Sequence, residues 1–417
     1  SGGYWHSVDL INWDLITTKD LPLEDYAPTA VVMNDTVYFM ASADKPAVYK
    51  TADPKTGKWQ IVNPEFPIGM IDPCFFVDDD NRLYFYYGCS PVNPLYAVEL
   101  DPKTFNPIGK PVELFNSNKE KYGWERFGDY NESKESSWLE GSWMTKYNNK
   151  YYLQYAIPGT QFKSYCDGLY VSDKPLGEFK LAKHNPISAK PEGFIGGAGH
   201  SSTFQDKYGN YWHISTMSIS VKHMFERRLG LFPMFFDKDG DLYTYTGFGD
   251  FPYKVPTKKI SSPEELSTGW MLLSYNKPVE VSSELADHPK KFITDENIRN
   301  YWSAKTANKG EWFSIDLEKE CSINAVQINY AENETQIFGR EGNIFYQYLL
   351  EYSSDNKNWQ VLTDKTQNTT DVPHDYIELN KPVKARYLRL TNYNMPSGTF
   401  AIAGFRVFGN GSGKAPY

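Results

Sequence analysis

The sequence is poor in cysteine, in basic residues relative to acidic ones, and in long apolar runs. Its four cysteines lack the CxxC or Cys/His spacing of a zinc site, and a disulfide between Cys74 and Cys89 is not the favoured interpretation. Lysine and arginine number 43 against 52 acidic residues, whereas phosphate binding needs clustered basic side chains. No run approaches the ~18 apolar residues of a membrane span. We therefore expect no nucleic-acid partner, no membrane span and a monomeric chain.

Aromatic residues, in contrast, are abundant. The 31 Tyr, 25 Phe and 11 Trp make up 16% of a chain of 417 residues, a length that suggests two or three domains. Aromatic side chains pack well on pleated sheets. Flat rings also offer an apolar face to the C–H side of a sugar ring, so the composition favours a β-rich protein and is compatible with sugar binding.

A hairpin pattern recurs through residues 1–255. Each copy has a Gly, Asn or Asp turn followed by an alternating aromatic strand, which is typical of a tight β-hairpin. The copies span residues 34–42, 80–88, 148–156, 209–216 and 239–247. Repeated four-stranded units of this size are typical of propeller blades, and helical periodicity is nearly absent. We predict an all-β propeller in which the closely spaced fourth and fifth hairpins share a blade.

One repeat position selects candidate functional residues. The residues 12 positions before the aromatic anchors of the hairpins are Tyr26, Asp72, Glu140, His200 and Leu231. Equivalent positions at the start of the innermost strands converge on the axis of a propeller. Asp72, Glu140 and His200 should therefore meet at one end of the channel, although they lie 68 and 60 residues apart.

Paired carboxyl groups across a pocket suit the hydrolysis of glycosides, which needs one group to protonate the leaving oxygen and another to activate water or attack the sugar. Glu140 lies between Trp138 and Trp143, an apolar setting that could raise its pKa. Either indole could also bind sugar, although a core position is the more common role. Arg227 or Arg228 could hold a carboxylate or a sugar hydroxyl. Taken singly, each residue has a purely structural interpretation.

The hairpin segments within residues 1–255 resemble successive blades of glycoside hydrolase family 43. The patterns DPxxFxDDDxxxY, starting at Asp72, and EGxxxxKxxxxYYL, starting at Glu140, occur in order within residues 1–255. The resemblance implies a five-bladed propeller with an inverting mechanism that cleaves arabinose- or xylose-containing glycans. It implies that Glu140 is the general acid and that Asp72 orients the acid and tunes its pKa. His200 would be the central histidine near a calcium ion or water, and Arg227 or Arg228 a subsite arginine.

The general base of that family is an aspartate in the first blade, ahead of a segment that here spans His6 to Trp13. Asp9, Asp14 and Asp20 do not fit, because each lies in or after that segment. By the repeat spacing, the base is expected roughly 20 residues before Ser1. The first blade would accordingly be incomplete at its N-terminal side.

Residues 256–270 have the composition of a linker, and the texture then changes to short strands with polar loops. Residues 271–410 resemble the coagulation factor 5/8 type C (discoidin) domain, close to carbohydrate-binding module family 32, through segments such as GEWFSIDL, YLLEYSSDNKNWQVL and ARYLRLTN. The resemblance implies a jelly-roll β-sandwich that binds sugars, with a structural calcium in many members. The loop 293–297 would supply part of that site, while AGFRVFG lacks the acidic residue often found there. Residues 411–417 form a tail.

We therefore expect an inverting glycosidase of the arabinofuranosidase or β-xylosidase type with an attached sugar-binding module. Its partner would be an oligo- or polysaccharide, it would require no cofactor, and it would be secreted, periplasmic or at the cell surface. A non-catalytic glycan-binding propeller, an adhesion protein and a galactose-directed glycosidase remain alternatives. The long loop 116–138 should shape the entrance, so deleting 118–134 should change substrate preference far more than stability.

Overall fold

The computed structural model describes residues 2–22, 25–69, 72–336 and 344–416, and the chain is built almost entirely of β-strands. It forms two compact units. The first consists of Ser1–Glu192, Gly196–Gly249 and Val255–Leu266, and the second of Gly193–Ile195, Asp250–Lys254 and Ser267–Tyr417. Within the described residues, no helix is long and apolar enough to cross a membrane.

The first unit contains four antiparallel meanders and one two-stranded sheet. The two-stranded sheet pairs β1 (Gly3–His6) with β2 (Asp14–Thr17). The meanders are β3 (Tyr26–Met33), β4 (Thr36–Ser42), β5 (Val48–Thr51) and β6 (Gln60–Asn63); β7 (Cys74–Val77), β8 (Leu83–Tyr87), β9 (Tyr96–Leu100) and β10 (Pro107–Glu113); β11 (Glu140–Tyr147), β12 (Lys150–Ile157), β13 (Cys166–Ser172) and β14 (Lys180–Leu181), with β15 (Ser188–Ala189) on β13; and β16 (Gly196–Gln205), β17 (Tyr211–Ser218), β18 (Arg227–Phe236) and β19 (Leu242–Thr244). Short 3-10 turns are η1 (Pro54–Thr56), η2 (Gly123–Glu125) and η3 (Pro263–Leu266).

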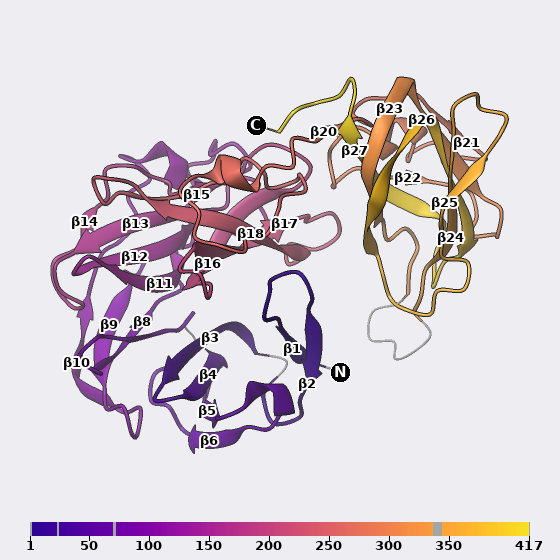
Figure 1. The fold of residues 1–417 in the computed structure, drawn as a ribbon. Helices are drawn as coiled ribbons and strands as arrows, with labels where there is room; N and C mark the ends of the chain where they lie inside the picture. The colour runs from indigo at the N-terminus through magenta and orange to yellow at the C-terminus, as the bar shows by residue number, and fades with distance from the viewer. Residues whose placement is uncertain (1, 23–24, 70–71, 337–343, 417) are drawn as a thin grey trace. The chain divides into compact units, whose positions relative to one another are not determined.

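The sheets follow one another as the blades of a propeller (Figure 1). The first strands of the meanders, β3, β7, β11 and β16, are neighbours in that order. The last two predicted hairpins do share a sheet, because β18 and β19 continue the meander of β16 and β17. Leu231 therefore lies on the third strand of that sheet and does not start an inner strand.

The hairpin turns explain how the sequence fixes these meanders. Asn34 and Asp35 both have positive φ, 51° and 57°, and so do Asn148 and Asn149, at 48° and 58°. Turns with two positive φ values match the twist of the paired strands, and Asn and Asp tolerate that conformation well. The Asn and Asp residues of these two turns thus help to set the register of the aromatic strands that follow them, β4 and β12.

Alternating side chains bind each blade to the next. In the second sheet, Phe75 and Phe85 pack toward the first sheet, whereas Cys74 and Tyr86 pack toward the third with Met144. This alternation follows from the two-residue period of a strand. Burial of both faces accounts for the aromatic content of this half of the chain.

The second unit is a β-sandwich. Its main sheet has the order β20-β27-β23-β26-β24-β25, with β21 on β23 and β22 on β27. The elements are β20 (Met271–Leu272), β21 (Val279–Val281), η4 (Lys290–Ile293), β22 (Trp302–Ser303), β23 (Trp312–Tyr330), β24 (Gln347–Ser353), β25 (Gln360–Asp364), β26 (His374–Asn394) and β27 (Ala401–Asn410). Trp302 is fully buried in its core beside Phe313 and Phe400.

Residues 256–266, part of the segment 256–270 that the composition predicts as a linker, belong to the first unit. The Ile260 side chain is buried there, and its backbone N–H donates to Asn210 Oδ1 at 2.9 Å. A segment held in this way has a fixed path over the propeller.

Candidate active site

Three inner strands bring the predicted residues to one end of the propeller channel. Asp72 lies two residues before β7 and has a φ of 45°, and Glu140 is the first residue of β11. His200 lies in β16, where the register against β17 shifts, and has a φ of 52°. Positive φ is uncommon outside glycine and marks a position where the backbone is held to aim a side chain.

Asp72 lies between the other two residues. Its Oδ2 is 3.8 Å from His200 Nδ1 and accepts a hydrogen bond of 3.4 Å from the backbone N–H of Gly141. The backbone N–H of Asp72 donates to Ser42 Oγ at 2.8 Å. Gly141 has a φ of 61°, and a Cβ there would lie 2.8 Å from the His200 ring, so glycine lets the ring approach the strand that carries Glu140.

Two side chains that sequence reasoning missed bind the Glu140 carboxyl group. The Tyr165 hydroxyl donates to Oε1 at 2.6 Å, and the Cys89 thiol donates to Oε2 at 3.4 Å. Cys89 is a neighbour because Ser90 and Leu139 exchange backbone hydrogen bonds of 3.1 and 3.0 Å. Neither residue occupies the repeat position, so no spacing signal pointed to it. All four cysteines are free, which excludes a Cys74–Cys89 disulfide.

The environment raises the pKa of Glu140. Burial of the carboxyl group is the largest cause, and the negative charge of Asp72 adds to it. His200, Tyr165 and Cys89 act in the opposite direction and do not cancel the rise. A glutamic acid whose pKa is raised in this way stays protonated at higher pH, as a general acid must.

Two fully buried side chains, Asp167 and His213, hold the backbone at His200 in place. The backbone N–H of His200 donates to Asp167 Oδ1 at 2.8 Å, and Asp167 Oδ2 lies 3.0 Å from His213 Nε2. Both partner side chains have no exposed surface. The other ring nitrogen of His213 contacts Thr203 Oγ1 at 3.2 Å. This network fixes the backbone where β16 bulges and thereby the position of the His200 ring.

Tyr26, the first residue of β3, also lies near the site. Burial and then the charge of Asp72 raise the pKa of its phenol, although the residue is 53% exposed. The repeat spacing selected this residue, but no chemical argument distinguished it from an ordinary strand residue.

The two predicted arginines begin β18. The Arg227 guanidinium contacts Thr160 Oγ1 at 3.4 Å, and Thr160 belongs to the loop that also carries Tyr165. Arg227 therefore contacts the loop whose Tyr165 donates a hydrogen bond to Glu140. Arg228 is exposed and donates to the Arg227 carbonyl at 2.9 Å.

The two tryptophans that flank Glu140 differ in position. Trp138 is 42% exposed, and its backbone N–H donates to the Pro158 carbonyl at 2.8 Å. Trp143 packs against the cluster between the second and third sheets, and its indole N–H donates to the Thr203 carbonyl at 3.0 Å. An exposed ring next to Glu140 can meet a sugar, whereas the indole of Trp143 is committed to packing.

The loop 116–138 is anchored in the propeller. Glu125 is fully buried and accepts a hydrogen bond of 2.6 Å from the Tyr155 hydroxyl. Gly128 accepts from Ser164 Oγ at 2.7 Å. Deletion of 118–134 would leave these buried donors without acceptors, so the structure argues against the expectation that such a deletion spares stability.

Point substitutions separate anchoring from entrance chemistry. Glu125→Ala should lower the free energy of unfolding by about 1–3 kcal/mol, because the Tyr155 hydroxyl loses its buried acceptor. Tyr130→Ala, at a side chain 71% exposed, should change it by less than about 0.5 kcal/mol. Urea unfolding of both variants measures this; equal stability of the two would show that Glu125 is no anchor.

The donor set around the two carboxyl groups does not fit calcium. One ligand atom from each of Asp72, Cys89 and Glu140 lies within 4.8 Å of the others. Calcium takes six to eight oxygen ligands, and a thiol between two carboxyl groups does not supply them. His200 offers nitrogen and lies outside this group as the described residues define it.

In the loop 293–297, which was predicted to bind calcium in the sandwich, the Glu296 carboxylate is already paired with an arginine. Arg406 on β27 forms a bidentate ion pair with Glu296, at 3.0 Å from Nε and 2.6 Å from Nη2. Both side chains are nearly buried. Asp295 beside it accepts from Asn297 and Asn300. A guanidinium already neutralises Glu296, so this donor set does not fit calcium.

Metal removal should therefore leave the sandwich unchanged. We expect the thermal unfolding midpoint in EDTA to equal that in millimolar calcium, because the Arg406–Glu296 pair supplies the positive charge. Differential scanning calorimetry of the purified protein in both buffers checks this. A midpoint that rises with calcium concentration would contradict it, since a ligand stabilises the state that binds it.

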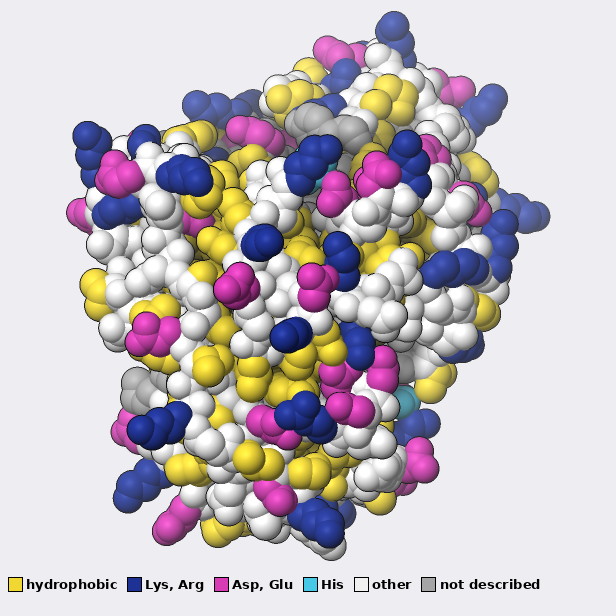
Figure 2. Space-filling model, turned by 90° about the vertical axis from the view of Figure 1, so that its left-hand side faces the viewer, with side chains coloured by type: hydrophobic (Ala, Val, Ile, Leu, Met, Phe, Trp, Pro, Cys, Tyr) yellow, Lys and Arg dark blue, Asp and Glu magenta, His cyan; other side chains and the backbone are white. Residues whose placement is uncertain are grey.

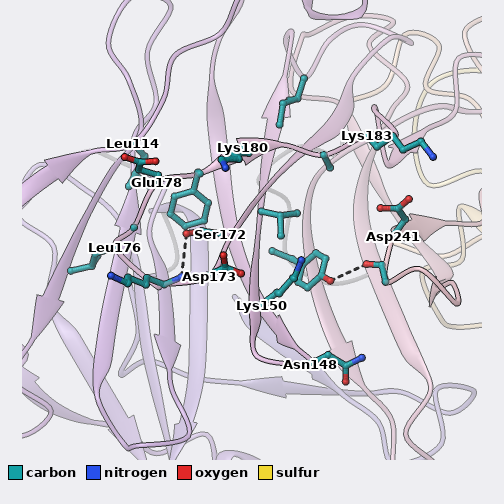
Figure 3. A pocket seen from close by; sticks show the side chains of 18 of the residues that line it. Leu114, Asn148, Lys150, Ser172, Asp173, Leu176, Glu178, Lys180, Lys183 and Asp241 are labelled. Atoms are coloured by element: carbon teal, nitrogen blue, oxygen red, sulfur yellow. Dashed lines mark hydrogen bonds between the residues drawn. The ribbon is translucent and has the colours of Figure 1, made fainter.

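A polar groove of about 1030 Å³ lies away from the carboxyl groups (Figure 3). It is lined by β14 and by the turns near Asn148 and Asp241, with Lys150, Asp173 and Lys180 around it. Asn148 follows β11 at the end opposite Glu140. Because its lining includes this far end of β11, the groove is separate from the candidate site.

The face of the molecule drawn in Figure 2 carries interspersed charges of both signs.

A propeller with a carboxyl group of raised pKa beside a second carboxyl group at the channel end is the arrangement expected of a propeller glycosidase. Residues 3–242 match the family model of glycosyl hydrolases family 43, and the chain belongs to this family. Residues 278–403 match the F5/8 type C domain, so the C-terminal unit is a domain of that type.

Relatives and solved structures agree with this assignment. The chain is 28% identical over 160 residues to a beta-xylosidase of Xylanibacter ruminicola, covering 34% of this chain and 46% of that protein. It is 31% identical over 153 residues to an arabinoxylan arabinofuranohydrolase of Paenibacillus polymyxa, covering 35% and 22%. The fold resembles an endo-1,4-beta-xylanase from Bacteroides thetaiotaomicron with a TM-score of 0.50 at 20% identity, covering 59% and 87%. The matched region spans less than half the length of these curated relatives.

Proposed function

We propose that the protein is an inverting glycosidase that cleaves arabinofuranosyl or xylopyranosyl linkages of plant glycans. The observation that carries this proposal is the Glu140 carboxyl group, enclosed beside Asp72 with its pKa raised. The curated relatives named above include a beta-xylosidase and an arabinoxylan arabinofuranohydrolase, which supports this choice of sugars. We place its action outside the cytoplasm, where such glycans occur.

In this scheme Glu140 donates its proton to the glycosidic oxygen as the bond to the sugar breaks. Asp72 keeps that proton on Glu140 until transfer, because two adjacent carboxylates repel each other. His200 and Arg227 border the sugar, and Trp138 offers it an apolar face. The general base that activates water is predicted roughly 20 residues before Ser1 by the repeat spacing. An inverting site needs ~6.5–9.5 Å between acid and base carboxyl groups to admit that water.

The C-terminal domain would bind glycan and hold the enzyme on its substrate. We propose that the enzyme needs no metal or organic cofactor, because proton transfer and water attack require only carboxyl groups. We also propose that it acts as a monomer.

Nitrophenyl glycosides of arabinofuranose, xylopyranose and galactose test this proposal directly. We expect one of the two pentosides to be cleaved and the galactoside to remain uncleaved. Each assay is repeated with sodium azide, a nucleophile that needs no general base, so that turnover does not depend on activated water. Binding to arabinan or xylan without release of any product under either condition would contradict a glycosidase and favour a glycan-binding propeller.

A further inference from the structure

We propose that Tyr165 is the positioning residue of Glu140: its hydroxyl occupies Oε1 and thereby assigns the transferable proton to Oε2. This proposal rests on the proposed function for its consequence in catalysis. Its structural part, the hold of one phenol on one carboxyl oxygen, stands on the geometry of the site alone.

The geometry of Tyr165 is built for this contact. Its ring is fully buried, and its hydroxyl lies 2.6 Å from Glu140 Oε1. A Cβ at position 199 would lie 2.9 Å from ring atoms of Tyr165, so Gly199 leaves the room that the ring needs. Tyr165 directly precedes β13, whose first residue, Cys166, pairs with Ile157. The phenol is therefore held by the sheet and cannot follow Glu140 if the carboxyl group rotates.

The two oxygens of Glu140 meet unequal donors. Oε1 accepts a short bond from a hydroxyl, whereas Oε2 meets only the Cys89 thiol at 3.4 Å. A thiol is a weak donor. An oxygen that already accepts a strong hydrogen bond is the poorer place for the acidic proton, so the proton resides on Oε2.

Proton transfer then proceeds from a defined atom. The O–H bond at Oε2 breaks, a new O–H bond forms on the glycosidic oxygen, and the electron pair stays on the carboxylate. The Tyr165 hydroxyl stabilises that carboxylate through Oε1, because a hydrogen bond to the charged form favours it. Tyr165 thus keeps the acid strong enough to release its proton despite burial and the charge of Asp72.

Tyr155 provides a matched control. It is fully buried on the neighbouring strand β12, and its hydroxyl donates to a different carboxylate, Glu125 Oε1, also at 2.6 Å. Tyr155→Phe and Tyr165→Phe each remove one buried phenol–carboxylate bond of the same length. Only the second removes a bond to Glu140.

The test measures the titration of Glu140 in the full chain by carbon-13 NMR of labelled glutamate, with the signal assigned by its loss in Glu140→Gln. Because the phenol lowers the pKa of Glu140, Tyr165→Phe should move this titration to higher pH. Tyr155→Phe should leave it in place. If Tyr165→Phe does not fold, 3-fluorotyrosine at position 165, a stronger donor, should move the titration to lower pH. An unchanged titration in a folded Tyr165 variant would overturn the proposal.

Kinetics give the second readout. Tyr165→Phe should reduce kcat about 10- to 100-fold on substrates with poor leaving groups, the loss of one bond to a charged group. KM should change little, and the high-pH limb of the rate profile should move upward. Tyr155→Phe should keep the wild-type kcat and limb. A wild-type protein that cleaves no glycoside would refute the proposed function, whereas the titration would still decide the role of Tyr165.

Discussion

Glu140→Gln should lower the hydrolysis of oligosaccharides by about 10²- to 10⁴-fold, because the variant lacks the proton that the leaving sugar requires. Gln keeps the size of the side chain and can still accept the hydrogen bond of Tyr165. The expected loss lies in kcat, with substrate binding largely retained. Initial rates on the oligosaccharide that the wild type cleaves best measure this loss.

The same substitution should stabilise the fold at high pH. Because the pKa of Glu140 is raised in the folded state, ionising it costs stability as pH rises from its ordinary value of 4.5 through the folded value. Glu140→Gln removes that cost, so its unfolding midpoint in denaturant should exceed the wild-type midpoint at about pH 8 and match it at about pH 4. A variant less stable than the wild type at both pH values would show that the activity loss reflects a damaged fold.

Asp167→Ala should destabilise the propeller by about 1–3 kcal/mol, the cost of leaving a buried hydrogen-bonding group without its partner. The substitution removes the acceptor of the His200 backbone N–H and of His213 Nε2, and the His213 side chain has no exposed surface from which to reach water. Activity should fall with stability, because the bulge that aims His200 loses its support. Chemical denaturation followed by tryptophan fluorescence measures the change.

Two further variants make this test specific. Asp167→Asn retains one acceptor oxygen and should lose less stability than Asp167→Ala. Asp239→Ala removes an exposed aspartate of the same unit and should change stability by less than about 0.5 kcal/mol. Equal losses for the Asp167 and Asp239 variants would refute the proposed support of His200.

Much of the fold was predictable because each hairpin has a recognisable local sequence pattern. Asn34–Asp35 and Asn148–Asn149 combine turn residues with an aromatic strand, and the repeat of this pattern predicts meanders and a propeller. The sandwich followed from alternating strands and from the resemblance of residues 271–410. Composition alone does not reveal that residues 256–266, which are rich in Lys, Ser and Pro, contact the propeller, as Ile260 does through Asn210.

The site was predictable only where it obeys the repeat. Asp72, Glu140 and His200 share an offset, and their inner strands bring them to one end of the channel. Cys89 lies near Glu140 because the adjacent residues Ser90 and Leu139 are paired, and Tyr165 contacts Glu140 because its ring is buried beside that residue. Such contacts depend on how neighbouring sheets pack, and the spacing along one chain does not encode them. The same holds for Arg406, whose pairing with Glu296 replaces the expected calcium chemistry.

The role of Glu140 as the proton donor is tested most directly by comparing leaving groups. The value of kcat/KM is measured for the wild type and Glu140→Gln on two glycosides of one sugar, one releasing nitrophenol and the other an alkyl alcohol. We expect a loss above about 100-fold on the alkyl glycoside and a far smaller loss on the nitrophenyl glycoside, whose nitrophenolate departs without protonation. Equal losses on both substrates would contradict it.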